Sequence, residues 1–166
     1  MPVVRAATID DAEPIARVHV RTWQQAYRGL VPDEFLDAMD VEQRAGVWRK
    51  GMLSDDERPV WVAETDGEVV GFASAGPSRD EDDVGELYGI YVDANHWDTG
   101  AGRDLMVTAT EWLRARHREA TLWVLEKNAR ARRFYEKGGW FFDGTSMNDD
   151  RTSFVLQEVR YRVDLT

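Results

Sequence analysis

The stretch ELYGIYVDANHWDTGAGRDLM, residues 86–106, decides the fold of this chain. Apolar residues alternate as far as Val92 and predict a strand, and a short polar loop follows. Gly100-Ala101-Gly102 then opens a segment with helical periodicity. A helix N-terminus favours an anion, because its first backbone N–H groups have no partner within the helix and its dipole is positive there. The stretch therefore predicts an anion site where a strand turns through a glycine loop into a helix.

Composition indicates one acidic globular domain spanning residues 1–166. The 21 basic and 31 acidic residues give a net charge of −10, which disfavours nucleic acid as a partner. The acidity either favours a cationic substrate such as an amine or serves solubility. Since the chain has no cysteine and His19, His96 and His117 share no ligand spacing, we expect no metal site. Without a long apolar run or a leader, we expect a cytoplasmic protein that binds no membrane.

Periodicity and turn residues predict alternating strands and helices along the chain. A first helix, capped by Thr8 with Asp11 in a box-like arrangement, continues to Ala26. The order predicts an α+β fold with one parallel crossover. The other expected helices are 33–39, 42–53, 100–118 and 128–137; the strands are 3–7, 59–64, 68–75, 86–92, 121–125, 140–144 and 154–163; a mobile loop is expected at 76–84 and a turn at 147–151.

A second segment, NARARRFYEKGGW at residues 128–140, carries polar groups at helical spacing. Asn128 is suited to cap the helix, and Gly138-Gly139 to end it. At 3.6 residues per turn, Asn128, Arg132 and Tyr135 fall on one face, so an amide, a cation and a phenol would face one place. Alternatively, the aromatic residues belong to the core and the arginines form a solvated face.

The glycine loop does not match the common nucleotide-binding patterns. The position three residues after Gly102 is Leu105 instead of the third glycine of the dinucleotide fingerprint, and a P-loop sequence is absent. The loop therefore indicates a pyrophosphate-binding element of another kind.

Together, the two segments resemble motifs A and B of the GNAT superfamily of acetyl-CoA-dependent N-acetyltransferases. Motif A, a strand followed by [QR]-x-x-G-x-[GA], corresponds here to residues 97–102. Motif B, N-x-x-A-x-x-[FL]-Y-E-K-x-G-[FW], is matched at every spacing by Asn128, Ala131, Phe134, Tyr135, Glu136, Lys137, Gly139 and Trp140. Residues 15–36 also resemble one branch of the superfamily. The resemblance implies a mixed, mostly antiparallel twisted sheet flanked by helices on both faces and splayed at its central parallel strand pair.

The resemblance also implies a binding site for acetyl-CoA as co-substrate. One departure is evident, because Trp97 stands where motif A has Gln or Arg, and Asp98 adds a negative charge; Arg103 is a candidate for the missing cation. The implied cofactor-binding residues are Ile90, Tyr91, Val92, Trp97, Asp98, Thr99, Gly100, Ala101, Gly102, Arg103, Asn128, Arg132 and Tyr135.

In such an enzyme a primary amine attacks the acetyl group directly. Tyr135 is the family-equivalent general acid, and backbone N–H groups around Tyr91 and Val92 would stabilise the oxyanion. Glu86 stands where many family members carry a base or a water relay, although it is equally a strand-edge charge. Asp93 and Glu126 are weaker candidates for the base.

The identity of the acceptor is left open by the sequence. Trp23, Tyr27 and Trp48 form either an aromatic wall of the acceptor site or ordinary core packing. The acidic run 80–83 either faces a cationic acceptor or is simply solvated. We expect a small-molecule amine, such as an amino acid derivative or a polyamine, and family resemblance suggests a homodimer formed through the last strands. The alternatives are a non-catalytic CoA-binding domain, a protein or peptide N-acetyltransferase and a nucleotide-binding module.

Overall fold

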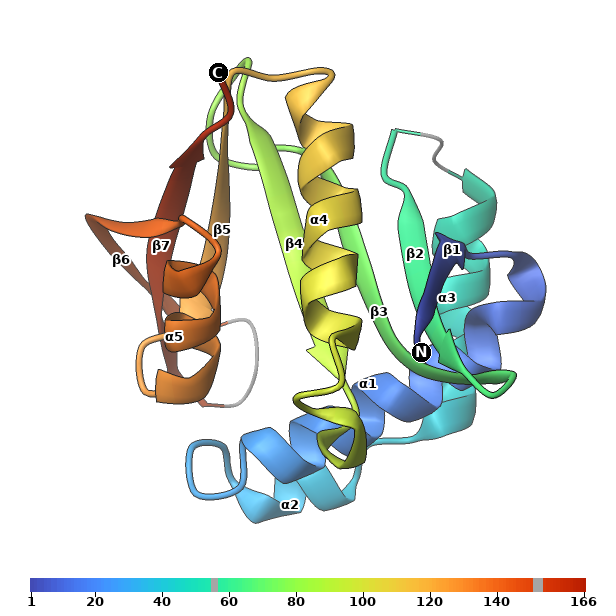
Figure 1. Ribbon diagram of the computed structural model, residues 1–166. Helices are drawn as coiled ribbons and strands as arrows, with labels where there is room; N and C mark the ends of the chain where they lie inside the picture. The colour runs from blue at the N-terminus through green and yellow to red at the C-terminus, as the bar shows by residue number, and fades with distance from the viewer. Residues whose placement is uncertain (55–56, 151–153) are drawn as a thin grey trace.

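The computed structural model describes residues 1–54, 57–150 and 154–166. Within these residues the chain forms one seven-stranded sheet in the order β1-β2-β3-β4-β5-β7-β6 (Figure 1). All neighbouring strands are antiparallel except β4 and β5. The strands are β1 (Val3–Ala6), β2 (Val60–Thr65), β3 (Glu68–Pro77), β4 (Gly85–Val92), β5 (Glu119–Leu125), β6 (Phe141–Asp149) and β7 (Leu156–Asp164).

Helices cover both faces of the sheet. Helices α1 and α3 pack on each other and against one face of β3, while α4 lies along the other face of β3 and β4 (Figure 1). None of the described helices is long and apolar enough to cross a membrane. The helices are the short η1 (Ile9–Asp11), α1 (Ala12–Ala26), α2 (Asp33–Asp37), α3 (Val41–Ser54), the short η2 (Ala94–His96), α4 (Ala101–Arg114) and α5 (Ala129–Lys137).

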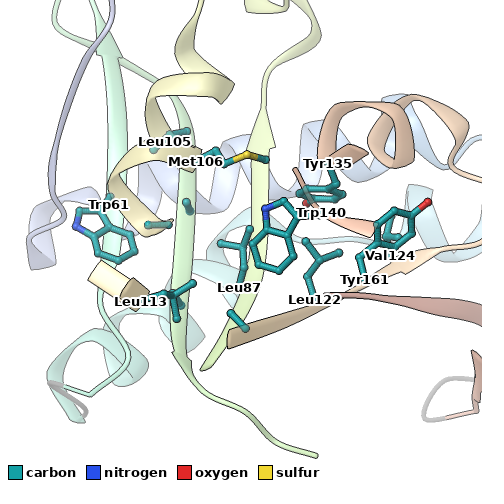
Figure 2. Close-up of a cluster of buried hydrophobic side chains, with 14 of the residues drawn as sticks. Trp61, Leu87, Leu105, Met106, Leu113, Leu122, Val124, Tyr135, Trp140 and Tyr161 are labelled. Carbon is teal, nitrogen blue, oxygen red and sulfur yellow. The ribbon is translucent and has the colours of Figure 1, made fainter. Parts of the chain in front are cut away.

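The alternation of apolar residues in β2 builds two cores on opposite faces of the sheet. Trp61 and Ala63 point into the larger cluster with Leu105 of α4, whereas Val62 packs with Ile15 on the α1 side. Figure 2 shows that the larger cluster extends from Trp61 to residues of β5, α5 and β7. The β1–β4 part and the β5–β7–β6 part are therefore held together largely through this cluster.

The two parts of the sheet separate just after β4 and β5 begin. Only Gly85 with Ala120 and Glu86 with Thr121 pair in parallel, and the two strands then diverge. A β-bulge leaves Tyr88 without an opposite residue in β3, and β5 pairs instead with β7 along its whole length. The predicted α+β fold, the single parallel crossover and the splay are confirmed.

Several predicted boundaries are wrong. The turn expected at 147–151 begins later, since β6 continues to Asp149 and its last residues pair with β7; residues 151–153 lie outside the described part of the chain. Cross-strand pairing here outweighs the low strand propensity of Asn148 and Asp149. The loop expected at 76–84 begins after Pro77, and the helix expected to end at 118 ends at Arg114.

The N-terminal capping residues act on a different helix from the one predicted. The backbone N–H of Thr8 donates to the Asp11 carboxylate at 2.7 Å, as the box-like spacing predicts. The capped element is the short η1, however, and α1 begins only at Ala12.

Candidate active site

A cleft of about 1070 Å³ opens where β4 and β5 diverge. One wall comes from the loop between β4 and α4 and from α5, and the other from α1, β5 and β7. Gly89, Ile90, Tyr91 and Val92 of β4 also line the cleft. The cleft therefore exists because two strands stop sharing hydrogen bonds in the middle of the sheet.

The first wall brings the N-terminal ends of α4 and α5 together. Gly100 caps α4 with φ of +93°, a conformation that favours glycine. A Cβ on Gly102 would lie 3.2 Å from Cε1 of Phe134, so this glycine allows α5 to approach α4 closely. The Asn128 side chain accepts from the backbone N–H of Ala131 at 3.2 Å and caps α5. Gly100, Gly102 and Asn128 all line the cleft.

Trp97 and Arg130 form a stacked pair on the same wall. The indole Nε1–H of Trp97 donates to the Val92 carbonyl at 2.9 Å. The Arg130 guanidinium lies 3.7 Å from the centre of the Trp97 ring, within the range of a cation–π interaction. Both residues line the cleft, so a cation from α5 lies against the loop that precedes α4.

Tyr135 is a buried phenol that lines the cleft between its two walls. Burial raises its pKa well above the usual value, the nearby Tyr91 adds to this effect, and a backbone hydrogen bond with Ile90 opposes it. Backbone groups alternate in direction along an antiparallel strand, so the Ile90 N–H points to the same side as the Val92 carbonyl, which accepts from Trp97. Tyr135 therefore keeps its proton at neutral pH beside a backbone donor of β4.

The second wall is aromatic and acidic. Trp23 and Tyr27 of α1 line it, with ring centres 4.6 Å apart. Glu158 of β7 lines it too; burial raises the pKa values of Tyr27 and Tyr91, and the charge of Glu158 contributes to raising both. A carboxylate thus lies near two phenols that line the cleft, a suitable environment for an ammonium group.

The model of the acetyltransferase (GNAT) family matches residues 18–140 of the chain. The chain belongs to the GNAT family. It is therefore an acyl-CoA-dependent N-acetyltransferase.

Relatives by sequence are named as N-acetyltransferases. An uncharacterized N-acetyltransferase of Archaeoglobus fulgidus is 36% identical over 137 residues, which cover 80% of this chain and 88% of the relative. The uncharacterized N-acetyltransferase YuaI of Bacillus subtilis is 35% identical, over 77% of this chain and 74% of its own length.

Solved structures share the fold at lower identity. The PaiA N-acetyltransferase of Thermoplasma acidophilum, solved with coenzyme A, superposes with a TM-score of 0.79 at 18% identity and covers 99% of both chains. The acetyltransferase YncA of Salmonella typhimurium, solved with acetyl-CoA, has a TM-score of 0.74 at 22% identity, covering 99% of this chain and 94% of its own.

Most residues expected from the GNAT motifs do line the cleft, with two exceptions. Ala101 is fully buried in the core beneath α4. Arg132 faces away from the cleft, where its Nε–H donates to the Tyr161 hydroxyl at 2.9 Å and its Nη1 to the Glu126 carbonyl at 3.0 Å. The expectation that Arg132 shares a face with Asn128 and Tyr135 is thus wrong, because its guanidinium reaches back over β7.

Glu86 does not line the cleft of this GNAT fold. It is fully buried at the point where β4 and β5 pair, and its carboxylate accepts from the Arg79 backbone N–H at 3.0 Å and from Nε and Nη2 at 3.1 and 2.5 Å. Arg79 itself lines the cleft. Glu86 is consequently placed to hold Arg79, and it lies behind the residues that a substrate would touch.

The weaker base candidates also lie outside the cleft lining. Asp93 is buried, pairs with Arg21 and accepts from the Asn95 N–H at 3.1 Å. Glu126 is an exposed residue at the end of β5.

The predicted acceptor wall is only partly present. Trp23 and Tyr27 line the cleft, but Trp48 packs in the core, with its ring centre 5.1 Å from that of Phe72. The acidic run 80–83 does not line the cleft. Asp80 accepts from the Trp123 indole at 2.6 Å, Glu81 pairs with Arg162, and the remaining two carboxylates border a separate hollow.

Sequence reasoning missed Arg130, Arg133 and Glu158, which line the cleft. The two arginines stand at variable positions of motif B, where the family pattern specifies no residue. Glu158 carries no local pattern and comes to the cleft through the pairing of β7 with β5. Among the described residues no group of three or more histidines and carboxylates gathers as metal ligands would.

Proposed function

We propose that this enzyme transfers the acetyl group of acetyl-CoA to the primary amine of a small cationic molecule by direct attack. The observation that carries the proposal is the position of Tyr135 in a cleft with a glycine-loop wall on one side and an aromatic, acidic wall on the other. The structures of PaiA with coenzyme A and of YncA with acetyl-CoA support the choice of co-substrate.

The first wall would hold the phosphates and the thioester. The backbone N–H groups at the start of α4 and the nearby arginines suit the pyrophosphate. Val92 presents its backbone to the cleft side, and antiparallel alternation along β4 turns the Ile90 N–H the same way, so this N–H would donate to the oxyanion as the amine attacks.

Tyr135 would supply the proton that the departing group needs. When the carbon–sulfur bond breaks, the electron pair goes to sulfur. The product is a thiolate whose conjugate thiol has a pKa of ~8.5. The phenol carries its proton at neutral pH and would transfer it to this sulfur, releasing coenzyme A as the thiol. Because the phenol pKa lies above that of a thiol, the transfer is uphill by about 2 kcal/mol or more and depends on close alignment of the two atoms in the cleft.

Glu158 would receive the acceptor amine. An alkylammonium with a pKa of ~10.4 must lose a proton before it attacks, which costs about 4.6 kcal/mol at pH 7. A carboxylate in the cleft would orient the ammonium and accept its proton directly or through water, and the rings of Trp23 and Tyr27 would contact its carbon chain. The buried Glu86 would act as a positioning residue through Arg79.

The proposal is tested by mixing the protein with acetyl-CoA and a panel of polyamines, amino acid derivatives and short peptides. Thiol release that depends on the amine, with a matching mass increase of one acetyl group on a small amine, is the expected result. Acetylation of peptides alone would favour a protein N-acetyltransferase instead. Thiol release that no amine increases, despite binding of coenzyme A, would favour a non-catalytic domain.

We further propose a cytoplasmic homodimer assembled through β6. This edge strand exposes Phe141 and Phe142, which are 53% and 45% accessible, and exposed aromatic residues on an edge strand are suited to contact with another copy. Light scattering on the purified protein measures the mass directly, and a monomer at all concentrations would contradict this assignment.

A further inference from the structure

The loop that precedes α4 lacks a positively charged side chain at its first position. Trp97 offers one N–H, and that N–H is already bound to the Val92 carbonyl at 2.9 Å. Asp98 follows with a negative charge and also lines the cleft. The side chains at these two positions therefore add no positive charge to the backbone N–H groups that the proposed function assigns to the anion.

Arg103, the cation that the sequence offers nearest to this loop, is poorly placed to compensate. Its Nε lies 3.8 Å from the Asp104 carboxylate, and its side chain is 79% exposed. An arginine beside a carboxylate contributes less to anion binding, because the carboxylate offsets its charge.

Arg130 has the geometry that Arg103 lacks. Its guanidinium is held 3.7 Å from the centre of the Trp97 ring, and both residues line the cleft. Within the described part of the chain, its guanidinium forms neither an ion pair nor a hydrogen bond with the protein. Stacking leaves the edges of the guanidinium, with their N–H groups, available to an anion.

We propose that Arg130 binds the pyrophosphate of acetyl-CoA and that Trp97 acts as the platform that orients it. This inference rests on the proposed function and deepens it. The indole is fixed by its bond to Val92, so the ring surface is rigid and the arginine loses little conformational freedom on binding. A cation carried by α5 thereby replaces a side chain that motif A normally carries in its own loop.

The test measures Kd for coenzyme A and for dephospho-coenzyme A, which keeps the pyrophosphate but lacks the 3′-phosphate, by titration calorimetry. R130A is expected to weaken both ligands by the same factor, about 10-fold or more, as the loss of a charge-assisted hydrogen bond predicts. A loss confined to coenzyme A would place Arg130 on the 3′-phosphate and overturn the assignment.

The chain offers a matched control. Arg116 stacks on Trp112 with its guanidinium 4.2 Å from the ring centre, at the far end of α4 and outside the cleft lining. R116A removes the same charge from the same kind of pair and should change neither Kd by more than about twofold, since exposed charges farther away than a Debye length are screened.

The role of Arg130 as a replacement for the motif A side chain is tested by restoring that residue type at position 97. W97Q places an amide donor in the loop, so the double variant W97Q/R130A is expected to recover most of the affinity that R130A loses. A double variant no tighter than R130A, or an R130A that equals R116A, would overturn this inference while leaving the proposed function intact. Wild-type protein that binds no coenzyme A would instead overturn the proposed function.

Discussion

The two walls of the cleft are built in opposite ways. The wall formed by the α4 loop and α5 consists of two short continuous segments, 97–103 and 128–135, and presents glycines, backbone N–H groups and arginines. The opposite wall gathers Trp23, Tyr27 and Glu158 from regions more than a hundred residues apart. The first wall suits one constant anionic ligand, whereas the second can vary without disturbing the first. Variants can therefore separate cofactor binding from acceptor binding.

The largest effect is expected at Tyr135, which lies between the two walls. Tyr135→Phe should lower turnover by about 100-fold or more, the usual range for a general acid, and leave the Kd of acetyl-CoA nearly unchanged. Thiol release and titration calorimetry measure the two quantities. Tyr161→Phe is the control, because it removes another buried hydroxyl, bound to Arg132 and Glu136, outside the cleft. Equal turnover in Tyr135→Phe and the wild type would remove the acid role.

The second prediction concerns His19, which lies behind the acceptor wall. Its ring stacks on Tyr91 at 5.5 Å between centres, and burial, with a smaller effect of Arg44, lowers its pKa to about 4. The unfolded chain protonates near pH 6.5, so stability is fully present above that pH and is lost as the pH falls toward 4, by up to about 3 kcal/mol.

Denaturant unfolding of the wild type and His19→Phe between pH 7 and pH 4 measures this contribution. The carboxylates titrate in both proteins, so the difference between their two slopes reports on His19. If burial keeps His19 neutral in the folded protein, the wild type should lose more stability than the variant over this pH range. Parallel curves would mean that His19 titrates normally in the folded protein.

Third, Glu158→Gln should weaken the reaction with the acceptor amine but not the binding of acetyl-CoA. Loss of the carboxylate should lower kcat/KM for the amine by about 10-fold or more, since hydrogen bonds to charged groups contribute ~1.5–3 kcal/mol. The Kd of acetyl-CoA should stay within twofold. Glu126→Gln, an exposed carboxylate that does not line the cleft, is the comparison. Equal kcat/KM in the two variants would show that Glu158 does not meet the amine.

The smallest effect is expected at Gly100, on the cofactor wall. Alanine at φ of +93° is strained by about 1 kcal/mol, although its Cβ would meet only Arg103 Nη2, at 3.9 Å. A loop that shifts to relieve this strain leaves its anion-binding conformation. Gly100→Ala should therefore weaken the binding of coenzyme A by about fivefold. Gly29→Ala introduces similar strain, at φ of +86° with open space around the Cβ, outside the cleft. Gly29→Ala should lower stability without changing the affinity for coenzyme A. A loss of affinity in both the Gly29 and the Gly100 variant would point to a global effect.

The same difference between the walls explains what the sequence could predict. Gly100, Asn128 and Tyr135 belong to patterns in which local spacing and backbone requirements specify the residue, and the structure places them in the cleft. Arg132 was misplaced because helical spacing gives a direction from the axis but not the reach of a long side chain. Glu158 could not be found, because its position depends on the register between β5 and β7.

Glu86 shows a further limit of reasoning from strand patterns. The alternation of 86–92 places it on a strand but gives no partner for its carboxylate, and Arg79, seven residues earlier, binds it in the structure. Loop residues that fold back onto a strand leave no periodic signal. The ion pair that removes Glu86 from the cleft therefore becomes visible only with the fold.

The divergence of β4 from β5 has one more consequence. It leaves an open strand edge in the middle of the sheet, and an open edge can pair with a strand of another chain. The Trp97 indole N–H donates to the Val92 carbonyl on this edge at 2.9 Å. The Trp97 side chain thus occupies a position at which an intruding strand would form a hydrogen bond, so a residue proposed for cofactor binding also hinders pairing with another chain at this edge.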